Sequence, residues 1–509
     1  MNLIKKNLVS KVLFFTDNYI MEKSVKKILS FAAVLFIALN AFNAAALEVD
    51  ENEIRSAGAD SVEFENYGGP HSIIESVEAI TGIGTALGTE LSSDIELART
   101  IQPGAKYSVI HAINSEDDGL LNADIFVLGE NAGVDHITNL RRILTGFLYS
   151  AYNYTWDDAQ TLATFLTVYN AVYRGQLDDL SPKYKDIVIQ NLDERKAGLS
   201  RNWEDWAGFT QILIPLKDVS EEAAPVETST ISDDKVIEAL RQEDDKSIDE
   251  REKMVDLKER EIESATQKAQ NAQKDAVQKK KEGNKEGAKQ SAKTSNEQQK
   301  IADKKRTEVQ SEKQNIAKDK EEILSVPQIE YTSGLFGSDK KGFYHLLNLN
   351  GHTGEILKKS SMTQIRSKAV YAVQAVTLVQ DGTTLTYPQM FVAICGEKSG
   401  KSAVRLCLID SESLELKAEN TEIISESSDL VPYSDRFFVI IQQDKKNYIA
   451  AYDKNLTLKN RSSIEVNPST PFNITEQGLL ITDSSGNPCM LSLNDLSTIW
   501  QAQSKKDEK

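Results

Sequence analysis

The most regular pattern in the chain is a seven-residue apolar repeat inside a charged stretch, residues 232–325. The stretch has no Pro, no aromatic residue and only two Gly, a composition that suits a long helix better than a globular core. A seven-residue apolar repeat is typical of a coiled-coil seam. The repeat falls into two series: Ile248, Val255, Ile262, Ala269 and Ala276, then Ala288, Ser295, Ala302, Val309, Ile316 and Ile323.

The two series are out of phase, and the slip coincides with Gly283 and Gly287. Glycine is costly inside a helix and suits a turn between helices. A turn at this point would place Val255 near Ile316 and Ile262 near Val309. We therefore expect a helical hairpin over residues 226–326, with one solvated rod or a parallel dimer with a stutter as the alternatives.

Residues 327–504 follow a different pattern, in which apolar runs alternate with turns rich in Gly, Asn, Asp and Ser. Pro327 is expected to end the long helix. An apolar strand, an Asn or Asp, a polar turn and a shorter strand recur four times, with anchors 60, 43 and 41 residues apart. Periods near 40 are typical of propeller blades, so we predict an all-β, propeller-like domain, with a β-sandwich as the alternative. The anchors are Asn350, Asp410, Asp453 and Asn494.

Residues 47–225 mix both periodicities and predict an N-terminal α+β domain. Helical spacing covers residues 73–87, 137–149 and 156–173, and Trp203 and Trp206 are interpreted as core anchors. Strands are predicted at 107–112, 124–128 and 212–216. Pro215 indicates that the last of these is an edge strand.

The first 46 residues have the pattern of a secretory signal, starting at Met21 and cleaved after Ala46. Three lysines precede the apolar run 28–39, which is short for a membrane span. An uncleaved anchor is the alternative. The mature chain is therefore expected to be exported to the periplasm or cell envelope and not to be transmembrane, with a charged tail at 505–509.

Charge and cysteine content narrow the function classes further. The net charge of −18 and the pI near 5.0 argue against a nucleic-acid partner, because phosphates would be repelled. Cys395, Cys407 and Cys489 form no C-x-x-C or Cys/His cluster, so no zinc site is expected. Cys395 and Cys407 flank a predicted turn and could pair, but we favour three buried thiols.

Two groups in the N-terminal domain resemble functional sites. His71, His111 and His136 could meet Asp124 or Asp135 as metal ligands or as an acid–base pair. Their wide spacing favours structural roles instead. The sequence therefore assigns no catalytic, cofactor-binding or metal-binding residue, and no cofactor.

The glycines Gly82, Gly84 and Gly88 lack the spacing and the preceding strand of a dinucleotide-binding turn, so close helix packing is the preferred interpretation. Arg141 and Arg142 are neighbours on a helix and point about 100° apart, so they are not expected to clasp one anion together.

Five segments of the front domain together carry a resemblance to a known family. They are Asn66-Tyr-Gly-Gly-Pro-His71, Ile80-Thr-Gly-Ile-Gly84, residues 107–112, Val134-Asp-His-Ile-Thr-Asn-Leu-Arg-Arg142 and Tyr169-Asn-Ala-Val-Tyr-Arg-Gly175. These segments resemble the Borrelia/Treponema 83/100-kilodalton antigen family of spirochaetes, and the order of signal, front domain, charged middle and β-rich end is also similar to that family. The resemblance implies an exported, immunogenic envelope protein and no established enzymatic activity.

We therefore expect a non-enzymatic structural or binding protein, with two folded heads on a helical spacer. Its expected partner is an envelope protein or a cell-wall component, and self-association through the helical region is a further expectation. One alternative is a hydrolytic enzyme using His111, His136 and nearby acids. Another is a small-ligand carrier that uses the propeller-like domain.

Overall fold

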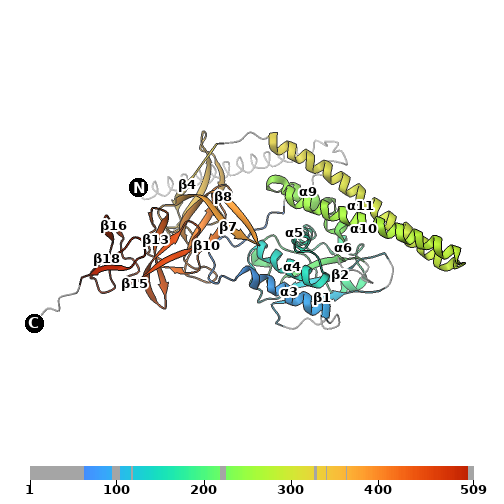
Figure 1. The fold of residues 1–509 in the computed structure, drawn as a ribbon, viewed down its shortest axis with the longest axis horizontal. Coiled ribbons are helices and arrows are strands. Elements are labelled where there is room, and N and C mark those ends of the chain that lie inside the picture. Colours follow the sequence, from blue (N-terminus) through green and yellow to red (C-terminus); the bar gives the residue numbers. More distant parts are fainter. Residues whose placement is uncertain are drawn as a thin grey trace, which may run out of the picture. The chain divides into compact units, whose positions relative to one another are not determined.

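The structure is a computed structural model that describes residues 62–93, 104–115, 119–217, 225–325, 330–339, 341–362 and 364–502. The predicted signal segment, Pro327 and the charged tail lie outside these residues. The described chain combines helices with several antiparallel sheets and is therefore α+β (Figure 1).

The front region is built on an antiparallel sheet in the order β1-β2-β3. The three strands lie where the sequence predicts them, and the Pro215-containing strand β3 is an edge strand as expected. Almost every residue of β2 and β3 is buried. The strands are β1 (Tyr107–Ala112), β2 (Asn122–Leu128) and β3 (Thr210–Leu216).

Three long helices accompany this sheet: α3 (Val77–Ser93), α4 (Ile137–Tyr152) and α5 (Trp156–Val172). The prediction that the first of them begins at residue 73 is wrong, because Ser76 accepts a hydrogen bond from the Ala79 N–H and so caps the helix later. Shorter helices are α6 (Leu177–Leu180), α7 (Asp186–Gln190), α8 (Thr228–Ile231) and α9 (Asp234–Arg241), with 3₁₀ turns η2 (Trp203–Asp205) and η3 (Asp244–Ser247).

The glycine run packs α3 closely against α4, as predicted. A Cβ on Gly84 would lie 1.7 Å from the Ile143 carbonyl oxygen, and one on Gly88 would lie 2.6 Å from the Phe147 carbonyl oxygen. Gly146 on α4 is equally close to Thr81. Gly82 has open space around it and takes no part in the contact.

The charged stretch forms two helices, α10 (Ile248–Lys281) and α11 (Lys285–Ser325), joined by a turn in which Gly283 has φ +81°. The cross-helix ion pairs Glu259–Lys313 and Glu252–Lys320 show that the helices are antiparallel, in the register predicted from the apolar series. The two helices therefore form a hairpin (Figure 1). That the pair winds as a coiled coil stays a prediction. Its core contains Val255, Ile262, Ala265, Ala302, Val309 and Ile316.

The β-rich region contains four consecutive antiparallel sheets. We call them the first to the fourth sheet in chain order. The first is β4 (Tyr331–Ser338), β5 (Tyr344–Asn350) and β6 (Ile356–Lys359). The second is β7 (Tyr371–Gln380), β8 (Thr383–Cys395), β9 (Arg405–Asp410) and β10 (Leu416–Glu419). The third is β11 (Ile423–Ile424), β12 (Val431–Tyr433), β13 (Arg436–Gln443), β14 (Lys446–Asp453) and β15 (Leu458–Val466). The fourth is β16 (Asn473–Thr475), β17 (Gly478–Thr482), β18 (Pro488–Leu491) and β19 (Thr498–Gln501).

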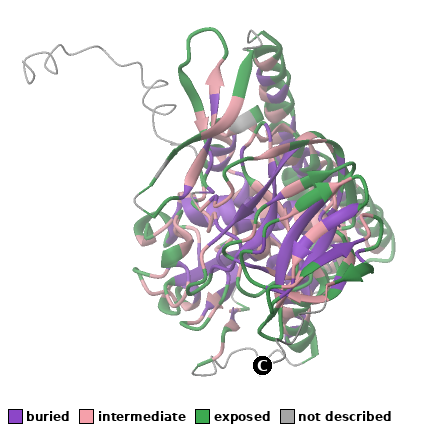
Figure 2. Ribbon diagram, turned by 90° about the vertical axis from the view of Figure 1, so that its left-hand side faces the viewer, coloured by how far each residue is buried: buried purple, intermediate pink, exposed green. Residues whose placement is uncertain are grey.

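These sheets stack face to face, and alternate side chains of an inner strand pack against the two neighbouring sheets. On β8, Met390 and Val392 belong to a core shared with the third sheet, whereas Phe391 and Ala393 belong to one shared with the first. On β13, Val439 faces the second sheet and its neighbours face the fourth. Inner strands are thus buried on both faces, and buried residues gather on the strands in Figure 2.

Each copy of the predicted repeat forms one sheet, but the described sheets do not close into the ring of a propeller. Within the described residues the four sheets form no closed barrel or propeller. The longer first interval contains the long β7–β8 hairpin, whose turn is Asp381-Gly382.

One anchor of the repeat was wrongly predicted. After Asp410, the Leu414 N–H donates to the Asp410 carbonyl oxygen, and the same bond links Gly354 to Asn350. In the fourth sheet this bond runs from Leu496 to Ser492, so Ser492 is the equivalent residue, not Asn494. A serine hydroxyl forms the same kind of turn as an Asn or Asp side chain, which hid it from a pattern based on Asn and Asp.

Candidate functional site

His111, on the edge strand β1, belongs to a buried polar cluster with Asp124 on the central strand β2. It stands directly opposite Asp124 in the β1–β2 register, and its Nδ1 is 2.6 Å from Asp124 Oδ1. The Tyr152 hydroxyl, at the end of α4, donates to the other carboxylate oxygen of Asp124. Burial and the Asp124 charge raise the pKa of Tyr152 well above its ordinary value.

A histidine held by a carboxylate can act as a general base when substrate reaches it. Access is the limiting factor here, because His111 is 7% exposed and Asp124 is fully buried. The geometry is therefore equally that of a satisfied polar group inside a core.

His136 caps helix α4 instead of joining His111. Its Nδ1 accepts a hydrogen bond of 3.1 Å from the Thr138 N–H, which requires an unprotonated nitrogen. Burial lowers the pKa of His136 to about 4, which keeps the ring neutral at neutral pH. Among the described residues no hydrogen bond joins His136 to His111, so the predicted hydrolytic pair is not assembled.

His71 lies between carboxylates from the front region and the second sheet. Its Nδ1 is 2.8 Å from Glu419 Oε1, and its Nε2 is 3.3 Å from Asp135 Oδ1. Burial acts to lower the pKa of His71, but hydrogen bonds and charge attraction from both carboxylates outweigh it and raise the value to about 9. His71 is therefore a cation at neutral pH.

Aromatic and cationic groups surround this imidazolium. Tyr67 meets His71 edge to face, with ring centroids 5.2 Å apart, and meets Trp203 in the same way. The Lys401 ammonium lies 4.1 Å from the Trp203 ring centroid and 3.9 Å from Asp135 Oδ2. Trp203 is thus part of this cluster and not a core anchor as predicted, whereas Trp206 is fully buried.

The segment that carries His71 joins the two regions through its backbone as well. The Ala403 N–H donates to the Pro70 carbonyl, and the Arg405 guanidinium donates to the carbonyls of His71 and Ser72. A Cβ on Gly68 would lie 2.7 Å from the Ser361 carbonyl oxygen, so glycine is needed for this approach. We call residues 66–72, Asp135 and Glu419 the junction.

A second contact reaches the front region from the tip of the β7–β8 hairpin. Arg142 donates to both carboxylate oxygens of Asp381, at 2.6 and 3.3 Å. Arg141 instead donates to Thr167, so the two arginines do not hold one anion, as expected. These direct contacts mean that the helical hairpin does not hold the two regions apart, in contrast to the expected spacer.

Two of the five resemblance segments contact each other. Asn66 Oδ1 accepts a hydrogen bond from the Ile137 N–H, and the Tyr67 N–H donates to the Asp135 carbonyl oxygen. In the segment 169–175, the Asn170 side chain exchanges hydrogen bonds with the Leu213 backbone on β3. These three segments therefore have structural roles.

A buried ionic network fastens the helical hairpin to the front region, and sequence reasoning missed it. The Lys305 ammonium, 3% exposed, lies 2.8 Å from Glu261 Oε2 and also contacts Glu227 and the Thr228 hydroxyl. Burial acts to raise the pKa of Glu261, but attraction to Lys217 and Lys305 lowers it to about 2. The carboxylate is thus charged and paired.

A similar cluster lies nearer the open end of the hairpin. Arg251 and Asp319 are fully buried and 2.7 Å apart, and Arg241 also donates to Asp319. The sequence did carry a signal, because these charges fall three residues after members of the apolar series, on the second line of core positions. The residues at those positions are Arg251, Lys258, Lys305, Glu312 and Asp319.

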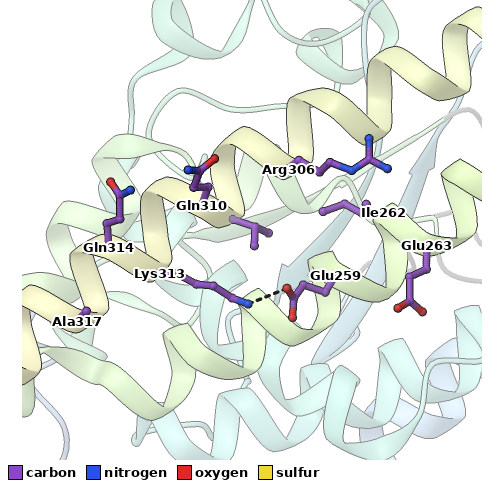
Figure 3. A pocket seen from close by; sticks show the side chains of 9 residues that line it. Glu259, Ile262, Glu263, Arg306, Gln310, Lys313, Gln314 and Ala317 are labelled. Carbon is purple, nitrogen blue, oxygen red and sulfur yellow. Dashed lines mark hydrogen bonds and ion pairs between the residues drawn. The ribbon is translucent and has the colours of Figure 1, made fainter.

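The outer side of the hairpin has an open groove of about 660 Å³ between α10 and α11 (Figure 3). Its base contains Ile262 and Val309, and its rims carry both signs of charge, including the Lys313–Glu259 pair at 2.7 Å. Both apolar residues are already buried in the hairpin core. The groove therefore offers little apolar surface to a ligand.

No group of three or more potential metal ligands is found in the part of the chain that the structure describes. Cys395, Cys407 and Cys489 are buried free thiols. Cys395 and Cys407 lie diagonally across β8 and β9, within one core. Within the described residues, no helix is both long and apolar enough to cross a membrane.

Comparison with known proteins supports the resemblance seen in the sequence. A search of curated proteins gave no match. The sequence profile of the family described as Borrelia P83/100 protein matches residues 51–331 and 338–472, which is most of the chain. The chain therefore belongs to the Borrelia P83/100 protein family.

Proposed function

We propose that this protein is an exported, non-enzymatic component of the cell envelope that acts by binding another envelope protein or a cell-wall component. The observation that carries the proposal is that the histidines, the side chains best suited to acid–base catalysis, are engaged in structural contacts. His71 joins two regions, His136 caps a helix, and His111 is buried against Asp124. Family membership and the predicted signal over residues 1–46 support export to the periplasm.

We also propose that the four sheets act together as an open, propeller-like array. Each sheet has a tight turn after an Asn, Asp or Ser residue, and the second, third and fourth sheets each stack on the sheet before them. Such an array offers an extended surface for a partner, whereas the groove of the helical hairpin has its apolar residues already buried and offers less. Self-association through the helical region is therefore a weaker candidate.

Cross-linking in intact cells tests the binding role. A photoreactive residue in place of exposed Tyr433 in the third sheet is expected to capture one specific envelope component. The same residue in place of exposed Leu324 at the end of α11 is the matched control. Recovery of identical, nonspecific products from both positions would contradict the proposal.

One observation favours an enzyme as the second candidate, namely the His111–Asp124 pair at 2.6 Å. The purified protein can be assayed with ester, amide and phosphate substrates alongside His111→Gln. Turnover that is present in the wild type and lost in this variant, with folding unchanged, would replace the binding proposal with a hydrolytic one.

A further inference from the structure

The outer face of the fourth sheet repeats the surface that the other sheets use to stack. Leu480, Met490 and Trp500 lie directly opposite one another across β17, β18 and β19. Met490 Sδ and Ile499 Cδ1 both lie close to the position that a Cβ on Gly478 would take, which places Ile499 on the same side. We call these four residues, Leu480, Met490, Ile499 and Trp500, the end face.

Equivalent positions in the second and third sheets are covered by the next sheet. Leu408, two residues before the turn residue Asp410, lies in the core between the second and third sheets. Ala451, two residues before Asp453, lies in the core between the third and fourth. Met490, two residues before Ser492, is the corresponding residue of the fourth sheet, and within the described chain no sheet follows it.

The end face remains partly open, because Ile499 is 52% and Trp500 is 45% exposed. A tryptophan and an isoleucine side by side are costly to leave in water and are frequent at the centres of interfaces. The established way to cover such a face in this chain is another sheet of the same repeat.

If a second copy of the chain covers the end face, its first sheet fits that face less well than its fourth sheet. In the later sheets a left-handed leucine inserts into the preceding sheet: Leu414, Leu456 and Leu496, with φ between +57° and +58° and little or no exposure. The first sheet has Gly354 at this position and so has no side chain to insert. The fourth sheet of a second copy presents the same uncharged residues, which matters because each chain carries a net charge of −18.

We propose that the end face binds the end face of a second copy of this chain, so that two fourth sheets stack about a two-fold axis. The proposal rests on the continuity of the stack and does not depend on the identity of any envelope partner. Sheet-on-sheet contact of this kind buries Trp500 of each copy at the centre of the interface.

Sedimentation of the full mature chain tests the proposal. The wild type is expected to show a concentration-dependent monomer–dimer equilibrium, and Trp500→Ser is expected to raise its dissociation constant about tenfold or more. Ile499→Ser is a second variant at the same face. Ile356→Ser is the matched control, because Ile356 is 61% exposed on the first sheet.

Cysteine cross-linking adds a geometric readout. With diamide as the oxidant, Ile499→Cys is expected to form a disulfide-linked dimer, whereas Ile356→Cys stays monomeric; the native cysteines are buried. A wild type that is monomeric at all concentrations would overturn the proposal. So would a dimer that is unaffected by Trp500→Ser and Ile499→Ser, or one that Ile356→Ser weakens equally.

Discussion

At the scale of single residues, His71 is the most informative side chain. Its imidazole lies between the carboxylates of Asp135 and Glu419, and its pKa is raised from 6.5 to about 9. A pKa that is raised in the folded state stabilises the fold fully below the unfolded value, and this stability is lost as pH rises through the folded value.

We therefore predict that His71→Asn lowers the free energy of unfolding by on the order of 2–3 kcal/mol near pH 6. The difference from the wild type should shrink as pH rises from 6.5 to 9, because the wild-type ring then loses its proton. Urea unfolding at several pH values measures it. The exposed His352, with a side chain 75% exposed, provides the control His352→Asn, and a pH-independent deficit in the His71 variant would contradict the prediction.

His136 gives a second prediction at this scale. His136→Ala should destabilise the fold by about 1 kcal/mol, because the Thr138 N–H at the start of α4 loses its acceptor. His136→Asn should recover most of the loss, since an Asn side chain can cap the helix in the same way. Chemical denaturation compares the three proteins, and an asparagine variant no better than alanine would rule out the capping role.

The sequence predicts these residues poorly for a physical reason. The sequence offered Asp124 and Asp135 as possible partners for all three histidines. Asp124 pairs with His111 and Asp135 with His71, but His136 caps a helix instead. Glu419, which completes the junction, lies 348 residues from His71. No local pattern in the sequence marks such a partner.

At the scale of elements, apolar spacing predicted the strands that end at the anchors Asp410 and Asp453, and it predicted the register of α10 with α11. The ionic network was missed because charged residues usually indicate a solvated face. At Lys305 the partners come from the front region, and only the folded arrangement brings Glu227 and Thr228 to the helix.

This network supplies a prediction for the hairpin. Lys305→Met should lower the free energy of unfolding by about 3–5 kcal/mol, because Glu261 and Glu227 lose a buried partner. Lys313→Met removes an exposed pair with Glu259 and should cost less than about 1 kcal/mol. Urea unfolding of both variants gives the comparison, and similar losses would mean that the network is not buried in solution.

The left-handed leucines give a prediction for the sheets. Leu414→Ala should cost about 2–5 kcal/mol, because the side chain is fully buried between the first and second sheets. Leu414→Gly should cost no more than the alanine variant, since glycine relieves about 1 kcal/mol of left-handed backbone strain at φ +57°. Thermal and chemical unfolding decide between them, and a much less stable glycine variant would show that this strain is negligible.

At the scale of the whole molecule, the junction and the Arg142–Asp381 pair join the front region directly to the β-rich region. We predict that combining Glu419→Gln with Arg142→Ala splits a single calorimetric unfolding transition into two, because the His71–Glu419 and Arg142–Asp381 contacts between the regions are then lost. Lys341→Ala removes an ion pair with Glu397 inside the β-rich region and should leave one transition. If the double variant still unfolds in one step, the contacts that remain, including the Lys401–Asp135 pair and the hydrogen bonds of Pro70 and Arg405, are enough to couple the regions, and the His71–Glu419 and Arg142–Asp381 contacts are not required.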